Sequence, residues 1–276
     1  MRTILSIAFI LFSITLLKGA DGPGDYMRLV EQYERSANQS NWQEADDYLC
    51  RAIACDPDNP QNALLMSNLG MIRFYAGQDS LALATLNRAV SMAPASVTLL
   101  GNRARVLTAL GFPAEAIRDY NTLESLDSTY TAPYLYRGLI YLYTGMLDEA
   151  TPNLEKLREL DDSSVDACIA LASYFTVIEK PEEAIPYYNN LINAEPAAEY
   201  YAGRARCLLA KDALLDAAED IASGLELDPD FSELYVCRAI LNKKRSRMDD
   251  ALTDGNRAIQ LGADRHYVYR LLGLDG

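Results

Sequence analysis

An alanine recurs along the chain at intervals close to 34 residues. The seven positions, which we call the register alanines, are Ala45, Ala82, Ala116, Ala150, Ala184, Ala217 and Ala251. The gaps between neighbours are 37, 34, 34, 34, 33 and 34 residues. A period of this length is typical of stacked copies of one small unit that cannot bury its own apolar face alone. The repeat therefore replaces the one or two globular domains that a length of 276 residues would suggest.

One copy, Thr131 to Ser164, reads as two helices joined by a tight turn. The first helix is predicted over about Pro133–Tyr143, and the second restarts near Asp148, a good N-cap residue. Gly138 in the first helix and Ala150 in the second are both small. Because two helices approach closely only where the facing side chains are small, we expect these two positions at the crossing point.

Further positions repeat with the same period. Four residues after the register alanine, an apolar or aromatic residue stands in six of the seven copies, and Gly255 is the exception. Twelve residues after it, a proline closes four copies: Pro57, Pro94, Pro196 and Pro229. A helix–turn–helix of 34 residues with this pattern resembles the tetratricopeptide repeat family over about Tyr26 to Arg265. The resemblance implies an all-α, right-handed solenoid of seven repeats that ends in a capping helix.

The period divides the chain as follows. The repeats are predicted at residues 26–59, 63–96, 97–130, 131–164, 165–197, 198–231 and 232–265. Residues 21–25 form a short linker, and residues 266–276 hold the cap, in which His266 to Leu274 reads as a short helix over the apolar end of the last repeat. Pro152 and Pro186 fall inside second helices, where we expect a kink or a late helix start.

Residues 1–20 have the pattern of a secretory signal peptide. Arg2 gives a positive start, and the largely apolar run Ile4–Leu17 follows it, too short for a comfortable membrane span. We predict cleavage near Ala20 and a periplasmic or secreted protein. Lys18 fits poorly three residues before that cut, so an uncleaved signal that anchors the chain in the membrane is the alternative.

The composition argues against several classes of function. A formal net charge of −14 disfavours nucleic acid and anionic membranes as partners. The single histidine, His266, leaves too little material for histidine-based catalytic or zinc sites, and no glycine-rich phosphate loop is present. We therefore predict no enzyme, no catalytic residues, no cofactor and no metal. The five cysteines have no CxxC spacing and are interpreted as small buried hydrophobes.

The resemblance also implies a binding surface, because first helices line a concave groove that commonly takes up a peptide or a helix of a partner. By repeat position, the candidate groove residues are Asn68, Phe74, Tyr75, Asn102, Arg105, Tyr136, Leu139, Tyr143 and Arg206. Asparagine amides can bond a peptide backbone, and tyrosine rings offer stiff amphipathic contact area. Two alternatives stay open: the tyrosines pack against the neighbouring repeat, and the arginines are solvated or paired with acidic side chains.

The sequence favours a non-enzymatic scaffold that binds a protein or peptide in this groove. The alternative is a chaperone-like holdase or assembly factor for envelope or luminal proteins. Some family members capture the C-terminal carboxylate of chaperones with a Lys/Asn/Asn/Lys/Arg set across three repeats. Here Val30 and Glu34 stand at the first-repeat positions of that set, so this specificity is not predicted.

Overall fold

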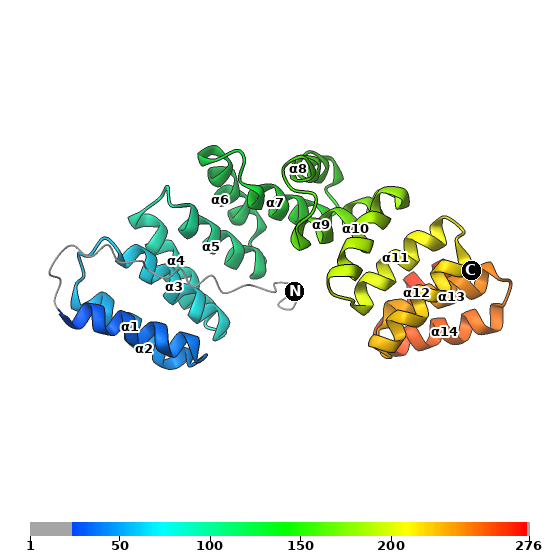
Figure 1. The fold of residues 1–276 in the computed structure, drawn as a ribbon, viewed down its shortest axis with the longest axis horizontal. Coiled ribbons are helices and arrows are strands. Elements are labelled where there is room, and N and C mark those ends of the chain that lie inside the picture. The colour runs from blue at the N-terminus through cyan, green and yellow to red at the C-terminus, as the bar shows by residue number, and fades with distance from the viewer. Residues whose placement is uncertain (1–23, 275–276) are drawn as a thin grey trace. The chain divides into compact units, whose positions relative to one another are not determined.

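The computed structural model describes residues 24–274, and every regular element in that range is an α-helix (Figure 1). The first helices of the repeats are α1 (Gly24–Asn38), α3 (Asn62–Tyr75), α5 (Val97–Ala109), α7 (Thr131–Tyr143), α9 (Val165–Val177), α11 (Ala198–Ala210) and α13 (Ser232–Lys244). The second helices are α2 (Trp42–Cys55), α4 (Asp79–Met92), α6 (Pro113–Leu126), α8 (Leu147–Leu160), α10 (Pro181–Ala194), α12 (Leu214–Leu227) and α14 (Met248–Gln260). The helix α15 (Arg265–Leu272) follows them. The predicted signal peptide lies outside the described residues.

The chain divides into two compact units, with the border inside α7. Unit 1 comprises residues 1–140 and unit 2 comprises residues 141–276. Within each unit, every complete first helix packs on the second helix of its own repeat, as α3 does on α4 and α13 on α14. Gly138 and Ala150 belong to different units, so their predicted crossing stays a prediction.

The small residues at the helix crossings carry the packing inside each repeat. All seven register alanines are fully buried, with 0% of their surface exposed. In unit 1, Gly70 of α3 holds the place equivalent to Gly138 and lies directly on α4. A Cβ atom at Gly70 would come within 2.6 Å of the Leu86 side chain and 3.3 Å of the Ala82 carbonyl oxygen. The two helices can therefore meet at this distance only because position 70 has no side chain.

A left-handed residue ends the first helix in all seven repeats. It stands five positions before the register alanine, and its φ lies between 55° and 80°: Ser40, Gly77, Gly111, Gly145, Glu179, Asp212 and Ser246. After α9, the Glu179 N–H donates to the Thr176 carbonyl at 3.3 Å. The Lys180 N–H donates to the Phe175 carbonyl at 2.8 Å. This is the Schellman arrangement, which satisfies the last helical carbonyls and reverses the chain.

Two details of the second helices differ from the sequence-based expectation. Asp148 is not an N-cap, because α8 starts at Leu147 after Met146 and Asp148 lies in its first turn. The predicted late helix start at the internal prolines is wrong, since α8 and α10 already begin five residues before Pro152 and Pro186. Both prolines are exposed, so water can satisfy the carbonyl left without a helical N–H.

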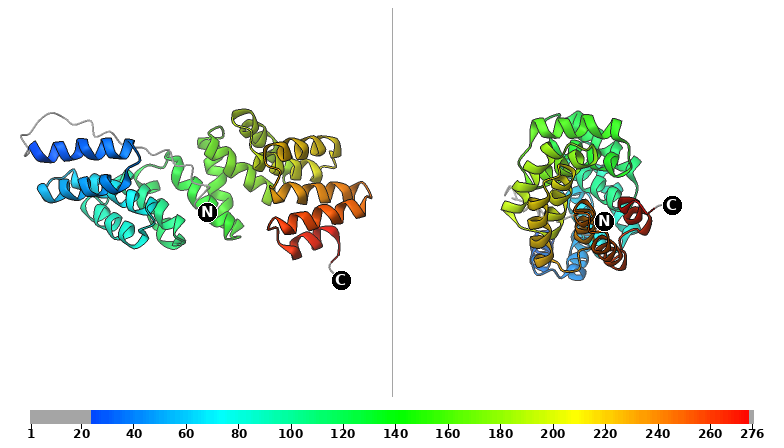
Figure 2. Two further views of the ribbon diagram at one scale, coloured as in Figure 1. Left: turned by 90° about the horizontal axis from the view of Figure 1, so that it is seen from below. Right: turned by 90° about the vertical axis from the view of Figure 1, so that its right-hand side faces the viewer.

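The capping helix explains the exception in the repeat pattern at Gly255. Figure 2 shows α15, in red, against α14, in orange, and both its buried side chains, Val268 and Leu272, lie on α14. A Cβ atom at Gly255 would come within 3.1 Å of Val268 and 3.0 Å of Leu272. The missing side chain therefore makes room for the cap. The helix starts one residue before the predicted His266, where the Asp264 carboxylate accepts the Tyr267 N–H at 2.7 Å.

The turns predict opposite effects of glycine at two equivalent positions. Glu179→Gly removes a left-handed non-glycine residue and should stabilise the protein by about 1 kcal/mol. Gly111→Ala should destabilise it by about 1 kcal/mol. No atom lies within 4 Å of a Cβ at Gly111, so that effect isolates the backbone conformation. Midpoints of urea unfolding measure both, and shifts of the same sign would contradict the prediction.

Candidate functional site

The first helices of neighbouring repeats lie closer together than the second helices. In unit 1, α3 contacts α5, and in unit 2, α11 contacts α9 and α13, whereas no two second helices within either unit are in comparable contact. Each row of helices therefore bends toward its first helices. Within each unit, we call the surface formed by the predicted groove residues other than Phe74 the inner side of that unit. In unit 1 these are Asn68, Tyr75, Asn102, Arg105, Tyr136 and Leu139, and in unit 2 they are Tyr143 and Arg206.

Phe74 is a core residue, which corrects its place among the groove candidates. Only 7% of its surface is exposed, and it packs in a cluster that includes Met71 and Val106. Its neighbour Tyr75 has 39% of its surface exposed. Successive residues of a helix point about 100° apart, so the change of one position separates core from surface.

The two asparagines are half-buried on α3 and α5. The Asn102 amide donates to the Ser67 hydroxyl at 3.0 Å, and Ser67 is fully buried. This bond joins neighbouring first helices and uses one of the two amide donors of Asn102. The other donor and the amide oxygen are the groups that Asn102 can offer to a bound backbone.

Arg105 lies near tyrosines of two other helices of unit 1. Its Nε atom is buried and makes no hydrogen bond. Tyr75 of α3 and Tyr120 of α6 are near enough to feel its charge: burial raises the pKa of both hydroxyls, and Arg105 opposes that rise. Tyr120 stacks on Tyr136 of α7, with ring centroids 5.5 Å apart and planes inclined by 15°. Among the predicted groove residues, Tyr136 therefore packs one face of its ring on a core tyrosine. Leu139, on the same helix, is half-buried.

In unit 2 the two predicted residues differ in character. Tyr143 has 62% of its surface exposed at the end of α7. Arg206 of α11 forms an ion pair with Glu233 of α13, so the alternative that it is paired holds for this arginine. Burial lowers the pKa of Arg206, but Glu233, together with Cys237, Tyr267 and Tyr188, raises it overall.

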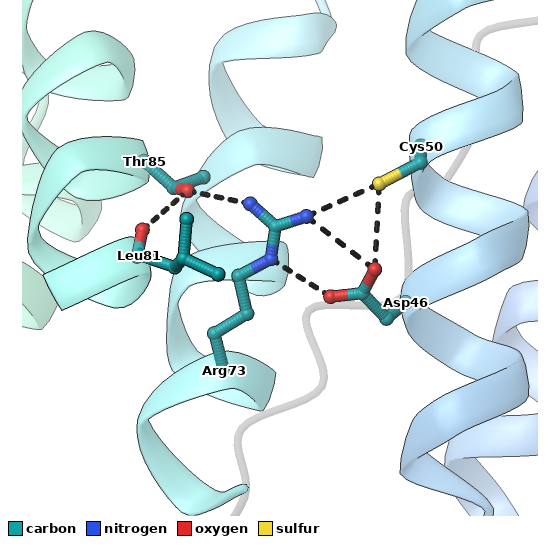
Figure 3. Close-up of polar contacts among 5 residues, drawn as sticks. All are labelled: Asp46, Cys50, Arg73, Leu81 and Thr85. Atoms are coloured by element: carbon teal, nitrogen blue, oxygen red, sulfur yellow. Dashed lines mark hydrogen bonds and ion pairs between the residues drawn. The ribbon is translucent and has the colours of Figure 1, made fainter. Parts of the chain in front are cut away.

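A polar cluster joins three helices of unit 1, and the sequence reasoning did not find it. Figure 3 shows the Arg73 guanidinium between α2 and α4. Its Nε donates to Asp46 at 2.8 Å, and its Nη1 donates to the Thr85 hydroxyl at 2.9 Å. A third guanidinium nitrogen lies 3.3 Å from the Cys50 sulfur. Burial and the Asp46 carboxylate raise the pKa of the Cys50 thiol, which keeps it neutral, so we assign the cluster a structural role.

A row of arginine–aspartate pairs repeats in three repeats and was also missed. In each pair the arginine of a first helix donates twice to an aspartate 16 residues later on the second helix: Arg103 to Asp119, Arg204 to Asp220, and Arg238 to Asp254. Arg204 also donates to Asn189 of the preceding second helix at 2.7 Å. The recurrence of Arg and Asp at this spacing, in step with the register alanines, is a signal that the sequence does contain.

The cysteines only partly follow the prediction of small buried hydrophobes. Cys168, Cys207 and Cys237 are buried, and burial raises the pKa of Cys237 to about 12. Cys50 is half-buried and Cys55 is exposed at the end of α2, so the prediction is wrong for Cys55. All five thiols are free, and α2 runs through both Cys50 and Cys55 without the break that a disulfide between them would need.

The one histidine, His266, is exposed on α15. The described residues contain no group of three or more His, Cys, Asp or Glu side chains placed to hold a metal ion. Within residues 24–274, no helix combines the length and the apolar character needed to cross a membrane.

Solved structures share this arrangement, and two of them are described as tetratricopeptide-repeat proteins. One from Parabacteroides merdae is 27% identical, with a TM-score of 0.67 over 91% of this chain and 98% of that one. PilW, a type IV pilus biogenesis factor, is 18% identical, with a TM-score of 0.65 over 77% of this chain and 98% of its own. YrrB, described as having an unusual peptide-binding site, is 20% identical, with a TM-score of 0.56 over 67% of this chain and 96% of its own. The fold is therefore a tetratricopeptide-repeat α-solenoid, as the repeat pattern predicted.

Sequence comparison is less specific. No protein-family model matches the chain. A DnaJ homolog subfamily C member 7 homolog from Dictyostelium discoideum is 22% identical over 89% of this chain and 50% of its own length. A TPR repeat-containing protein from Methanocaldococcus jannaschii is 28% identical over 56% of this chain and 29% of its own length. The chain thus spans half or less of these curated relatives.

The arginine–aspartate row predicts a large difference between two matched substitutions. Asp220→Ala leaves Arg204 without its carboxylate at a site where the two side chains are 6% and 23% exposed, and should cost about 2–4 kcal/mol. Asp47→Ala breaks the ion pair between Asp47 and Arg51, whose side chains are 63% and 55% exposed. This change should lower the free energy of unfolding by less than about 0.5 kcal/mol. Both aspartates lie in mid-helix, so helix propensity cancels. Urea unfolding measures the two costs, and equal costs would refute the structural importance of the row.

Proposed function

We propose that the chain is a non-enzymatic protein-interaction scaffold whose inner side binds a segment of a partner protein. The observation that carries the proposal is a pair of exposed tyrosines at one repeat position, Tyr75 of α3 in unit 1 and Tyr143 of α7 in unit 2. Each stands seven residues before a register alanine. Exposed tyrosines held on rigid helices offer large contact area at little cost in side-chain entropy.

The mechanism of binding is geometric. The buried alanines hold the helices of each repeat together, so the protein orders little of itself when a partner arrives. A flexible partner segment supplies most of the ordering cost. The fold shared with YrrB, whose published description is a peptide-binding one, supports this class of ligand.

The proposed compartment is the periplasm or another secretory compartment. Its support is the pattern of residues 1–20, with a positive start, the apolar run Ile4–Leu17 and small residues at Gly19 and Ala20. In this compartment we propose a partner that is itself an envelope or luminal protein.

Photocrosslinking tests the proposed surface. A photoreactive phenylalanine analogue replaces Tyr75 or Tyr143 in the full chain. In the control it replaces Leu215, an exposed apolar residue on a second helix. We expect one or two proteins to be captured from both tyrosine positions and not from position 215. Capture of many unrelated unfolded proteins would favour the holdase alternative. Capture from position 215 alone would place the binding surface on the second helices and refute the proposal.

The location has its own test. N-terminal sequencing of the chain isolated from its host should find a start close to Asp21. A chain that still begins at Met1 and stays with the membrane fraction would instead support the uncleaved anchor, and one that begins at Met1 in the cytosol would contradict both.

A further inference from the structure

Two arginines of the inner side hold the same place in their repeats. Arg105 of α5 and Arg206 of α11 each stand eleven residues before the register alanine of their repeat. Both are partly buried. Equivalent positions in a repeat protein meet equivalent neighbours, so the surroundings of one arginine predict what the other requires.

Arg206 obtains its counter-charge from the next repeat. Its guanidinium forms an ion pair with Glu233, which lies 27 residues further along, in the first turn of α13. Tyr188 and Tyr267 lie near the same guanidinium. The repeat position thus accommodates an arginine when a glutamate carboxylate reaches it from the following first helix.

Arg105 lacks that counter-charge. The residue 27 positions after it, in the first turn of α7, is Ala132, whose methyl group cannot pair with a cation. Arg105 forms no ion pair with any residue in the described range, and its buried Nε makes no hydrogen bond. Every other arginine on the first helices from α3 to α13 pairs with a carboxylate: Arg73, Arg103, Arg137, Arg204, Arg206 and Arg238.

The setting of Arg105 favours an anion over water as its partner. Tyr75 and Tyr120 lie within reach of its charge, and Tyr136 is stacked on Tyr120. The buried Nε of Arg105 is shielded from water and still has its N–H to donate. A carboxylate that approaches such a group forms charge-assisted hydrogen bonds, which are about twice as strong as neutral ones.

We propose that Arg105 binds the side-chain carboxylate of a glutamate in the partner segment that occupies the inner side of unit 1. The partner's glutamate takes the place that Glu233 holds beside Arg206. A side chain from a continuous segment fits because inner-side residues continue beyond Arg105 on both neighbouring helices, with Tyr75 on α3 and Leu139 on α7. The inference rests on the proposed function and names the chemistry that the site selects.

A peptide library tests the inference with the full chain. Twelve-residue random peptides displayed on phage are selected on the wild-type protein, and the best binder is synthesised with each of its glutamates in turn changed to glutamine. Fluorescence polarisation then gives the dissociation constants. We expect one Glu→Gln peptide to bind at least about tenfold more weakly to wild type. Against Arg105→Gln, the Glu and Gln peptides should bind within about twofold of each other.

A second pair of variants supplies the missing counter-charge internally. Ala132→Glu should occupy Arg105 and weaken the Glu peptide at least about tenfold, whereas Ala132→Gln, of the same size without the charge, should weaken it much less. Arg118→Gln, at an exposed arginine on the second helix α6 and outside the inner side, should leave binding unchanged. Ala132→Glu should also raise the thermal midpoint above that of Ala132→Gln, and this gain should vanish when Arg105 is changed to Gln.

The outcomes separate this inference from the function on which it rests. If peptides bind the inner side but lose nothing on Glu→Gln or on Arg105→Gln, the glutamate site is refuted and the scaffold proposal stands. If binding requires the free C-terminal carboxylate of the peptide and not a glutamate side chain, the proposed glutamate site is refuted. If no library peptide binds, and photocrosslinking from Tyr75 and Tyr143 also fails, both proposals fall. Equal thermal midpoints for Ala132→Glu and Ala132→Gln would refute the equivalence with Glu233.

Discussion

Close contact between paired helices at one small residue is the constraint on which this structure depends. The register alanine is fully buried in every repeat, and in α3 the facing residue is a glycine that touches α4. A side chain at position 70 would meet Leu86 and the carbonyl oxygen of Ala82, so this crossing depends on its absence. Once this contact is fixed, the rotation of each helix is fixed, and so is the set of side chains that it turns toward its neighbours.

Polar groups then distinguish otherwise similar repeats. The buried alanines fix how the two helices of each repeat pack. They do not determine which charged residues stand at the neighbouring positions. Arg103, Arg204 and Arg238 are neutralised within their own repeats, and Arg206 by the following repeat. Arg105 has no such partner, because Ala132 holds the position that corresponds to Glu233. Apolar packing thus sets the fold, and the distribution of charge over that fold sets the surface.

The sequence predicts the fold because the fold is periodic. Seven copies of one spacing predict where the helices, the turns and the cap lie. The departure from the pattern at Gly255 is explained only by the structure, where α15 packs on that position. The same periodicity is too coarse for single side chains: Phe74 and Tyr75 are neighbours, and only the rotation of α3 decides that the first is core and the second is surface. The pairing of Arg206 with Glu233 depends on a distance between repeats, and only the structure shows that residues 27 positions apart meet there.

Contacts that reach only one repeat along the chain have a kinetic consequence. The hydrogen bond between Tyr26 and Asn62 joins residues 36 positions apart, and that between Asn102 and Ser67 joins residues 35 apart. Chains with such short loops to close have low contact order and fold quickly. Each repeat can therefore begin to fold as soon as its neighbour has been synthesised, and the C-terminal cap closes a structure that is already largely built.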